Sequence, residues 1–465
     1  MITKELGFQV IEAALQTGGD FVEIFEDHKH RSNYLMINGI IESANSGIEY
    51  GIGIRIYQGL QSVYAYTNDR TAEGLLSCAA TLAKGFHGKQ STHCAPLKET
   101  TVEVVHHIAK KPSTYSAEEK VALMKRANDT MLAYDPVIKK AVVNYMEEEQ
   151  QVLILNSDGK YIQDERIRTR MGMEAIAMDG ELMATGSKRP GAHCGLELYD
   201  RFSIEETAAD AARMAKTMLY ADECPSGDMT VIIDNGFGGV IFHEACGHSL
   251  EATSVAKGSS VFANKLGQKI ASELVTAVDD ATIPNAWGSN HIDDEGNPTK
   301  RNVLIENGIL KSYLVDTLNG RRMNTASTGS SRRQSYQFEP TSRMSNTFIE
   351  NGTSSFDEIV AATKLGLYAK NLGGGSVNPA TGDFNFAVLE AYLVKDGQIV
   401  KPVKGATLVG KGSDVLLKID MVGNNLSREQ GMCGSISGSI PTDVGQPTIR
   451  VSSMTVGGKG GTLHE

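Results

Sequence analysis

The segment from His243 to His248 places two imidazoles and one carboxylate within six residues, with Glu244 directly after the first histidine. Neutral imidazoles are good zinc ligands, and a glutamate beside them can take the proton of a water molecule that attacks an amide carbon. The segment therefore predicts a zinc-dependent peptidase.

The spacing of the two histidines determines how the backbone must carry them. The common zinc signature is H-E-x-x-H, in which both histidines share one face of a helix. Here they stand at positions 243 and 248, and five residues of regular α-helix leave two side chains roughly 140° apart. A helix that brings both to one ion must be deformed, and Gly247, a poor helix former, predicts a π-type bulge at that position.

A third ligand must come from elsewhere, because a catalytic zinc usually has three protein ligands and one open position. Cys246 lies close to His243 in the sequence but is poorly placed to share an ion with His248. Glu251 could be a ligand or could orient the ring of His248 from the second shell. Cys433 is distant, and its glycine-rich surroundings give the backbone freedom to approach. The residues alone leave these three candidates open.

The residues before the motif predict a strand, a turn and a helix. Residues 231–233 are β-branched and apolar, 234–236 read Asp-Asn-Gly, and 239–242 form an apolar lead into the motif. This arrangement would present the histidines at the mouth of a strand-turn-helix unit.

Several separated segments occur in an order typical of one protein family. They are DNGFGG at 234–239, HEACGHSLE at 243–251, IPNAWG at 283–288, GGGSVNP at 373–379 and MCG at 432–434. On these segments the chain resembles the TldD/PmbA family, specifically the TldD branch that keeps the metal motif, over nearly its whole length.

The resemblance implies a set of roles. It implies that His243, His248 and Cys433 hold Zn²⁺ and that Glu244 is the general base, and it assigns Cys246 no ligand role. It also implies a protease of unfolded or small peptides, enclosed in a homodimer or in a heterodimer with a PmbA/TldE-type subunit.

Two other functions compete with the peptidase. The first is a non-catalytic modulator or binding protein in which the metal is structural or absent. The second is a thiol enzyme that uses Cys246 beside His243 or His248. Metal analysis together with a cleavage assay, with and without chelator, would separate the modulator from the peptidase. Inactivation by Cys246→Ala with zinc retained would favour the thiol enzyme.

Length and composition set the class of protein. A chain of 465 residues suggests two or three domains. No apolar run approaches the ~20 residues of a membrane-spanning helix, and the first seven residues lack the layout of a signal peptide. We therefore expect a cytoplasmic protein without a membrane partner.

The spacing of the cysteines and the net charge limit the bonds and the binding partners that we expect for this protein. The six cysteines show no paired spacing, which favours free thiols or ligands over a disulfide framework. The formal net charge of −11 opposes binding to a phosphate backbone. Nucleic acid is not an expected partner.

The amino-terminal half, residues 1–224, predicts an α+β domain with an internal boundary near 100–115. Helices are expected at 4–17, 71–84, 116–134 and 204–220, the third opened by a capping box of Ser116 and Glu119. Strands are expected from 21 to 66, and 156–159 should be a hairpin turn.

The carboxyl-terminal half, residues 225–465, predicts a β-rich domain that carries the bulged metal-binding helix. Asn307-Gly308 and Asp396-Gly397 each predict a tight hairpin. One further helix is expected at 357–370. The whole chain is thus expected to be of the α+β class.

Three other features each have a purely structural interpretation and a functional one. Residues 325–336 predict a mobile surface loop, with a lid over the metal as the alternative. The glycines at 373–375 predict close backbone packing, with a peptide-lined cleft as the alternative. His291 could stabilise an oxyanion or reach the second shell of the metal. No catalytic role is predicted for the remaining histidines, which are His28, His30, His87, His93, His106, His107, His193 and His464.

Overall fold

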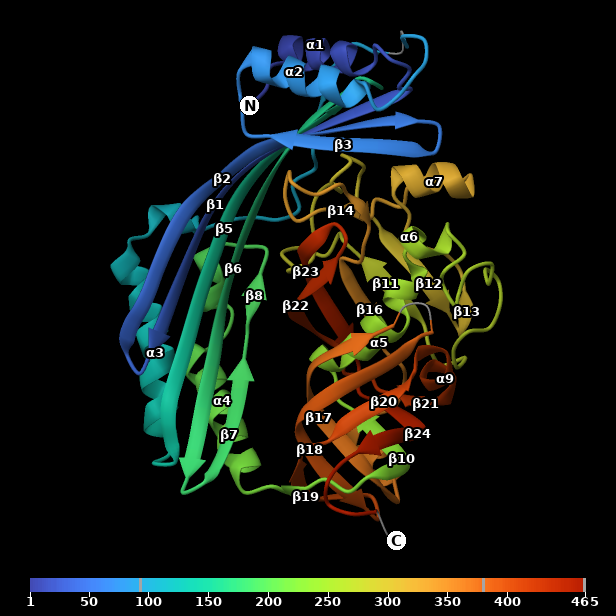
Figure 1. The fold of residues 1–465 in the computed structure, drawn as a ribbon. Coiled ribbons are helices and arrows are strands. Elements are labelled where there is room, and N and C mark those ends of the chain that lie inside the picture. Colours follow the sequence, from blue (N-terminus) through green and yellow to red (C-terminus); the bar gives the residue numbers. More distant parts are fainter. Residues whose placement is uncertain (92–93, 379–380, 463–465) are drawn as a thin grey trace.

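The computed structural model describes residues 1–91, 94–378 and 381–462, so His93 and His464 lie outside the described residues. An amino-terminal part built on one long curved sheet stands beside a β-rich carboxyl-terminal part (Figure 1). The α+β class predicted from the sequence is confirmed. No described helix is long and apolar enough to cross a membrane.

The amino-terminal sheet has eight strands in the order β3-β2-β1-β5-β6-β4, and β7 and β8 both pair with β6. Its long central strands arch over the molecule and reach the carboxyl-terminal part (Figure 1). The strands are β1 Phe21–Ile37, β2 Ile40–Gln58, β3 Gln61–Thr67, β4 Lys98–Thr100, β5 Ile138–Asn156, β6 Lys160–Asp179, β7 Leu182–Lys188 and β8 Gly191–Ala192.

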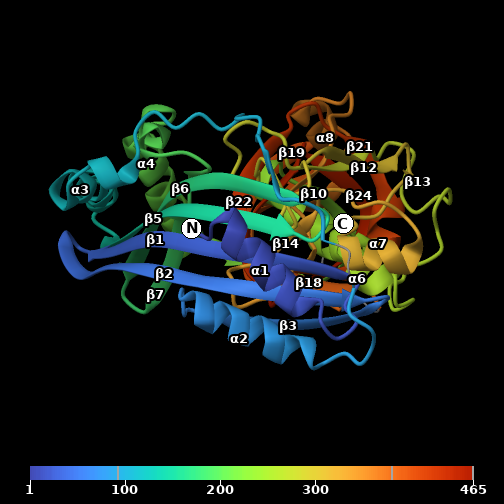
Figure 2. The ribbon, with the colours of Figure 1, turned by 90° about the horizontal axis from the view of Figure 1, so that it is seen from above.

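Four helices cover the outer face of this sheet at its two ends (Figures 1 and 2). They are α1 Lys4–Ala14, α2 Ala72–Ala83, α3 Ala117–Tyr134 and α4 Ile204–Leu219. The predicted capping box of α3 is present, with Ser116 and Glu119 bonded to each other's backbone. The first two helices and the last two cover separate hydrophobic cores. All four predicted helices are therefore confirmed to within three residues.

The carboxyl-terminal part holds two larger sheets. One has the order β17-β10-β24-β20-β18-β19-β9 with β21 against β24, and the other has the order β13-β12-β11-β16-β23-β22. Their strands, with the small pair β14 and β15, are β9 Asp222–Glu223, β10 Gly227–Ile233, β11 Ala277–Asp280, β12 Arg301–Glu306, β13 Ile309–Leu310, β14 Ser331–Arg332, β15 Thr341–Ser342, β16 Asn346–Ile349, β17 Leu365–Val377, β18 Asp383–Lys395, β19 Gln398–Lys404, β20 Thr407–Lys411, β21 Ile419–Val422, β22 Ser427–Ser435, β23 Gly438–Gln446 and β24 Ile449–Gly457.

Short helices fill the space around these sheets. They are α5 Val240–Ala245, α6 Ala252–Val255, α7 Thr317–Met323, α8 Phe356–Ala361 and α9 Gly412–Val415. The first of them, α5, lies between the two sheets, in contact with β16 and β23 on one side and β17 and β18 on the other. Its residues Val240, Ile241 and Phe242 are buried in the main core.

Both hairpins predicted in the carboxyl-terminal half are confirmed. Asn307 and Gly308 connect β12 to β13, and Asp396 and Gly397 connect β18 to β19. All four have positive φ, as a two-residue hairpin turn of this kind requires. The six cysteines are free, as their spacing predicted.

The prediction of a helix at 357–370 is correct only as far as Ala361 and is wrong for the rest of the segment. Helix α8 ends at Ala361, and Leu365 begins a strand instead. Residues 366–369 pair in parallel with 230–233 of β10. That partner lies more than 130 residues away in the sequence, so local periodicity gave no sign of it.

The mobile surface loop predicted at 325–336 is also wrong. Within it, Ser331, Arg332 and Arg333 are at most 5% exposed. Arg333 bonds Glu23 of β1 and the carbonyl of Asp294. The segment is buried between the two halves of the chain, where Arg333 meets a carboxylate from the distant strand β1.

The glycines at 373–375 lie within β17. A Cβ on Gly375 would clash with the ring of Phe386, whereas a Cβ on Gly374 would meet nothing within 4 Å. The predicted close packing therefore holds for Gly375 and does not hold for Gly374.

Candidate metal centre

The histidine motif follows β10 through a short 3-10 turn at Gly236–Gly239 and then forms α5. The helix ends after Ala245, where Cys246 takes φ −127° and ψ −49°, and the chain continues as a 3-10 turn over Gly247–Leu250. The bulged helix predicted from the sequence is therefore replaced by a helix end and a tighter turn. This arrangement sets the rings of His243 and His248 with their centroids 5.0 Å apart.

Gly247 permits this turn for a reason that the sequence did not reveal. A Cβ at this position would lie 2.2 Å from Sδ of Met344, far inside van der Waals contact. The missing side chain therefore makes room for a buried methionine beside the motif. The position of the helix break was predicted correctly from the sequence, whereas the packing of Met344 against Gly247 was not.

Cys433 reaches the motif on the hairpin formed by β22 and β23. Its Sγ lies 3.2 Å from Nε2 of His243 and 3.3 Å from Nε2 of His248. Strand β23 pairs in parallel with β16, which contacts α5. The sheet that carries the thiol is thereby fixed against the helix that begins the motif.

The sulfur–nitrogen distances in the donor cluster suit a small tetrahedral ion. All lie within 4.8 Å of one another, and over residues 1–91, 94–378 and 381–462 no other group of three histidine, cysteine or acidic side chains meets that condition. Zinc bonds of about 2.3 Å to sulfur and about 2.05 Å to nitrogen imply sulfur–nitrogen separations of about 3.6 Å in a tetrahedron. The observed 3.2 and 3.3 Å are close to that value.

The electrostatics of the cluster favour a thiolate. Burial by itself would raise the pKa of Cys433, but the charge of His243 and hydrogen bonds from both imidazoles hold that pKa well below its usual value. Burial likewise opposes charge on His248, whereas Glu251 and Cys433 raise its pKa. A thiolate is the form of cysteine that binds metal ions.

Two glutamates lie next to the histidines in different roles. Glu251 accepts from Nδ1 of His248 at 3.3 Å, which leaves Nε2 facing the thiol and fixes the ring orientation. Glu244 has an Oε2 3.7 Å from Nε2 of His248, and its side chain is 23% exposed. Glu244 is therefore open to solvent at the edge of the donor cluster, while Glu251 is buried behind it.

Arg343 and Trp287 hold the hairpin that presents Cys433. The guanidinium of Arg343 is fully buried and donates to the carbonyls of Cys433 and Gly438. The indole of Trp287 donates to the carbonyl of Gly431 at 2.8 Å. Arg343 was missed by the sequence analysis because a single arginine among polar residues gives no local signal.

Cys246 is not part of the donor cluster. It is fully buried in the main hydrophobic core, and that burial raises the pKa of its thiol. A buried thiol of this kind is a poor nucleophile, which weighs against the thiol enzyme.

His291 lies outside the donor cluster as well. Its Nδ1 is 2.7 Å from Asp164, and its ring contacts His106, which in turn contacts His193. His106 and His193 are buried. Burial lowers the pKa of His106 to about 3.

Comparison with known proteins shows the family of this chain. Residues 22–85, 110–219 and 226–458 match, in turn, domain 1, the central domain and the C-terminal domain of the PmbA/TldA metallopeptidases. The chain belongs to this metallopeptidase family. The TldD/PmbA resemblance seen in the sequence is thereby confirmed.

Relatives and solved structures cover almost the whole chain. It is 35% identical to the "Metalloprotease TldD homolog" of Buchnera aphidicola over 93% of this chain and 92% of that protein. The protein of the same name from Haemophilus influenzae is 35% identical over 94% and 93%. The crystal structure of TldE from Thermococcus kodakarensis has a TM-score of 0.75 at 20% identity, covering 98% of this chain and 100% of that one, so it shares the fold.

Proposed function

We propose that this protein is a zinc peptidase in which His243, His248 and Cys433 hold the metal and Glu244 is the general base. The observation that carries the proposal is the convergence of two imidazole nitrogens and one thiol sulfur, from segments far apart in the sequence, within 4.8 Å. Membership of a metallopeptidase family supports the same chemistry. A relative in Saccharolobus solfataricus, 25% identical over 97% of this chain, is named a zinc metalloprotease TldD homolog.

Each side chain of the site has a separate role in amide hydrolysis. When bound, zinc supplies a Lewis acid that activates water and polarises a carbonyl. Glu244, partly exposed beside His248, accepts a proton from the attacking water and delivers it to the leaving amine. Glu251 keeps the ring of His248 oriented. Arg343 holds the carbonyl of Cys433 and thereby its strand.

We propose small or unfolded peptides as substrates, cleaved in the cytoplasm by a dimer. The buried position of Cys433 and His243 supports access by a flexible chain rather than by a folded protein. The fold shared with TldE supports either a second copy of this chain or a TldE-type subunit as the partner. Residues 225–465 would be the catalytic domain and 1–224 the domain that covers it.

Peptide cleavage with and without metal tests the proposal. The protein should contain about one zinc per chain, lose cleavage of a fluorogenic peptide in a strong chelator and regain it when zinc is returned. Cys246→Ala should keep both metal and activity. Metal retention without cleavage of any peptide would favour a modulator with a structural metal, and activity that survives complete metal removal would contradict the proposal.

A further inference from the structure

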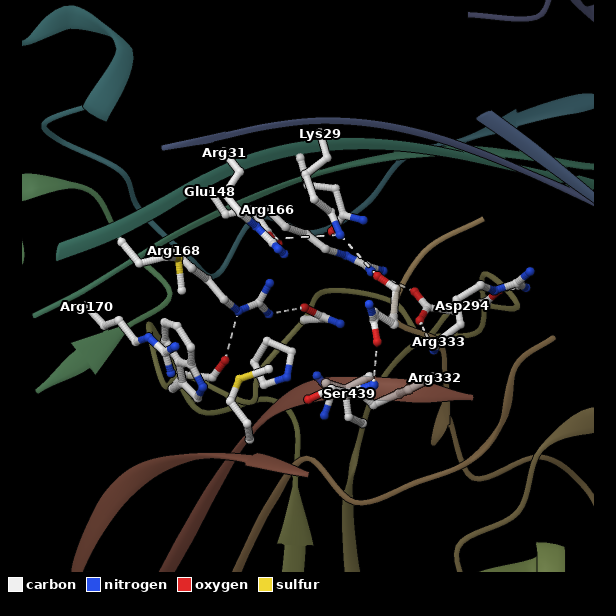
Figure 3. Close-up of a pocket in the computed structure, with 18 of the residues that line it drawn as sticks. Lys29, Arg31, Glu148, Arg166, Arg168, Arg170, Asp294, Arg332, Arg333 and Ser439 are labelled. Carbon is white, nitrogen blue, oxygen red and sulfur yellow. Dashed lines mark hydrogen bonds and ion pairs between the residues drawn. The ribbon is translucent and has the colours of Figure 1, made fainter. Parts of the chain in front are cut away.

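A basic pocket of about 140 Å³ lies between the inner side of the amino-terminal sheet and the β22–β23 hairpin (Figure 3). Seven basic and two acidic side chains line it, although the whole chain carries a net charge of −11. In Figure 3, Arg168 and Arg170 lie on the left, below the strands of the amino-terminal sheet, and Arg332 and Ser439 lie lower in the view. The positive charge is thus concentrated in one pocket.

Four of the seven cations already have carboxylate partners. Lys29 and Arg31 share Glu148. Arg166 binds Asp164 and Asp294. The fourth, Arg333, binds Glu23.

The other three, Arg168, Arg170 and Arg332, form no ion pair with any carboxylate in the part of the chain that the structure describes. Arg168 donates to the carbonyls of Trp287 and Ser289 and to the amide of Asn290. Arg332 donates to the carbonyl of Met344, and Arg170 lies over the ring of Trp287. The pocket therefore has three arginines without an acidic partner.

Burial makes this excess of charge costly. Arg168 and Arg332 are at most 4% exposed. Their burial, reinforced by neighbouring arginines, lowers the pKa of Arg168 to about 10 and that of Arg332 to about 9. A buried cation without a counter-charge destabilises a fold, so an anion that enters the pocket gains strong charge-assisted hydrogen bonds.

The pocket adjoins the candidate metal centre. Met432, which precedes Cys433, lines it, and so does Ile440, the register partner of Cys433 across the hairpin. Neighbouring Cα atoms along a strand or across a pair are about 4–6 Å apart. A peptide with one end in the pocket would therefore need to extend by only a few residues to reach the thiol of Cys433.

We propose that the basic pocket binds a carboxylate of the peptide substrate and so positions the chain for cleavage at the metal. This inference rests on the proposed function. The planar guanidinium forks match a carboxylate, and the small volume excludes a nucleic acid duplex. The carboxylate is either the carboxyl terminus of the peptide or an Asp or Glu side chain.

Three peptides of equal length distinguish these sources. One has a free carboxyl terminus and no acidic residue, the second is its amide, and the third is the amide with one glutamate near that end. Binding is measured by fluorescence anisotropy with the zinc-loaded Glu244→Gln chain. We expect the first or third peptide to bind about tenfold more tightly than the second, and the one that does so identifies the source.

The variant Arg170→Gln tests the pocket directly, because Arg170 is only partly buried. It should abolish the tenfold preference and leave binding of the plain amide unchanged. The control Arg201→Gln removes an exposed arginine that does not line the pocket and should keep the preference. Sulfate should compete with the carboxylate peptide more strongly than chloride at equal ionic strength, which tests the pocket without any substitution.

Equal affinity for all three peptides, or tighter binding of a short oligothymidylate than of any peptide, would overturn the inference. The experiment is independent of turnover. If the wild-type protein cleaves no peptide but still prefers carboxylates through Arg170, the proposed function fails and the anion pocket remains. If it cleaves all three peptides equally well, with equal KM, the pocket inference fails alone.

Discussion

Cys433 follows His248 by 185 residues, yet its Sγ lies 3.3 Å from Nε2 of that histidine. The two residues belong to different elements, a 3-10 turn and the strand β22. Their contact forms only when the carboxyl-terminal sheets have closed around α5. Metal binding and folding of this part of the chain are therefore expected to be coupled.

The first prediction concerns Glu244. Glu244→Gln keeps the shape of the side chain but cannot accept a proton, so cleavage should fall by about 10²–10⁴-fold while zinc content stays at the wild-type level. Steady-state cleavage of a fluorogenic peptide and metal analysis of the same sample measure both. Glu273→Gln, at an exposed position, is the matched control and should behave as the wild type. Activity within threefold of the wild type would show that Glu244 is not the general base.

The second prediction concerns Glu251. Because its carboxylate holds Nδ1 of His248, Glu251→Gln should weaken zinc binding by about 10–100-fold. Competition with a chromogenic chelator measures the affinity. An unchanged affinity, with Glu273→Gln again as the control, would show that the orientation of His248 does not depend on this contact.

The third prediction concerns the turn at Gly247. Gly247→Ala places a methyl group 2.2 Å from Sδ of Met344, so the free energy of unfolding should fall by about 1–3 kcal/mol and zinc affinity should fall with it. Gly374→Ala adds the same methyl group where nothing lies within 4 Å and should change stability by less than about 0.5 kcal/mol. Chemical denaturation of both variants measures the difference. Equal stability of the two would contradict the packing role of Gly247.

The fourth prediction concerns Glu390, a buried carboxylate that binds Arg213 of α4 through both oxygens. Burial opposes its charge, but Arg213, Tyr392 and Lys370 lower its pKa from 4.5 to about 2. Because the pKa is lower in the folded protein, the carboxylate stabilises the fold above pH 4.5, and this contribution is lost as the pH falls towards 2.

Glu390→Gln should therefore lower the free energy of unfolding by about 2–4 kcal/mol at pH 7. The difference from the wild type should shrink as the pH is lowered from 5 to 3. Urea denaturation across that range measures it. Glu205→Gln, which breaks the exposed pair with Arg126, should cost less than about 1 kcal/mol. A difference for Glu390→Gln that stays constant with pH would contradict the link between α4 and β18.

Local features of the chain were predictable from the sequence. The capping box at Ser116 and the two-residue turns at Asn307-Gly308 and Asp396-Gly397 depend on residues within a few positions of one another. The position of the break near Gly247 was also predictable, because glycine is a poor helix former, although its packing against Met344 was not. Interactions between residues that are close in the sequence can be inferred from the local sequence alone, which is why these predictions agree with the structure.

Features that depend on distant partners were not predictable. The strand at 365–369 exists because β10 pairs with it, and the burial of Arg333 depends on Glu23. The basic pocket gathers arginines from β6 and from the 325–336 segment, which no local pattern connects. Cys433 was left open by the residues and was chosen through the family resemblance. Its position beside both histidines agrees with that choice.

The central claim is that His243, His248 and Cys433 hold one zinc ion. A crystal of the zinc-loaded protein, measured on both sides of the zinc absorption edge, tests it most directly. The account predicts one anomalous peak per chain, bonded to Nε2 of both histidines at about 2.0–2.1 Å and to Sγ of Cys433 at about 2.3 Å. A peak elsewhere, or one at the histidines with Cys433 beyond bonding distance, would contradict it.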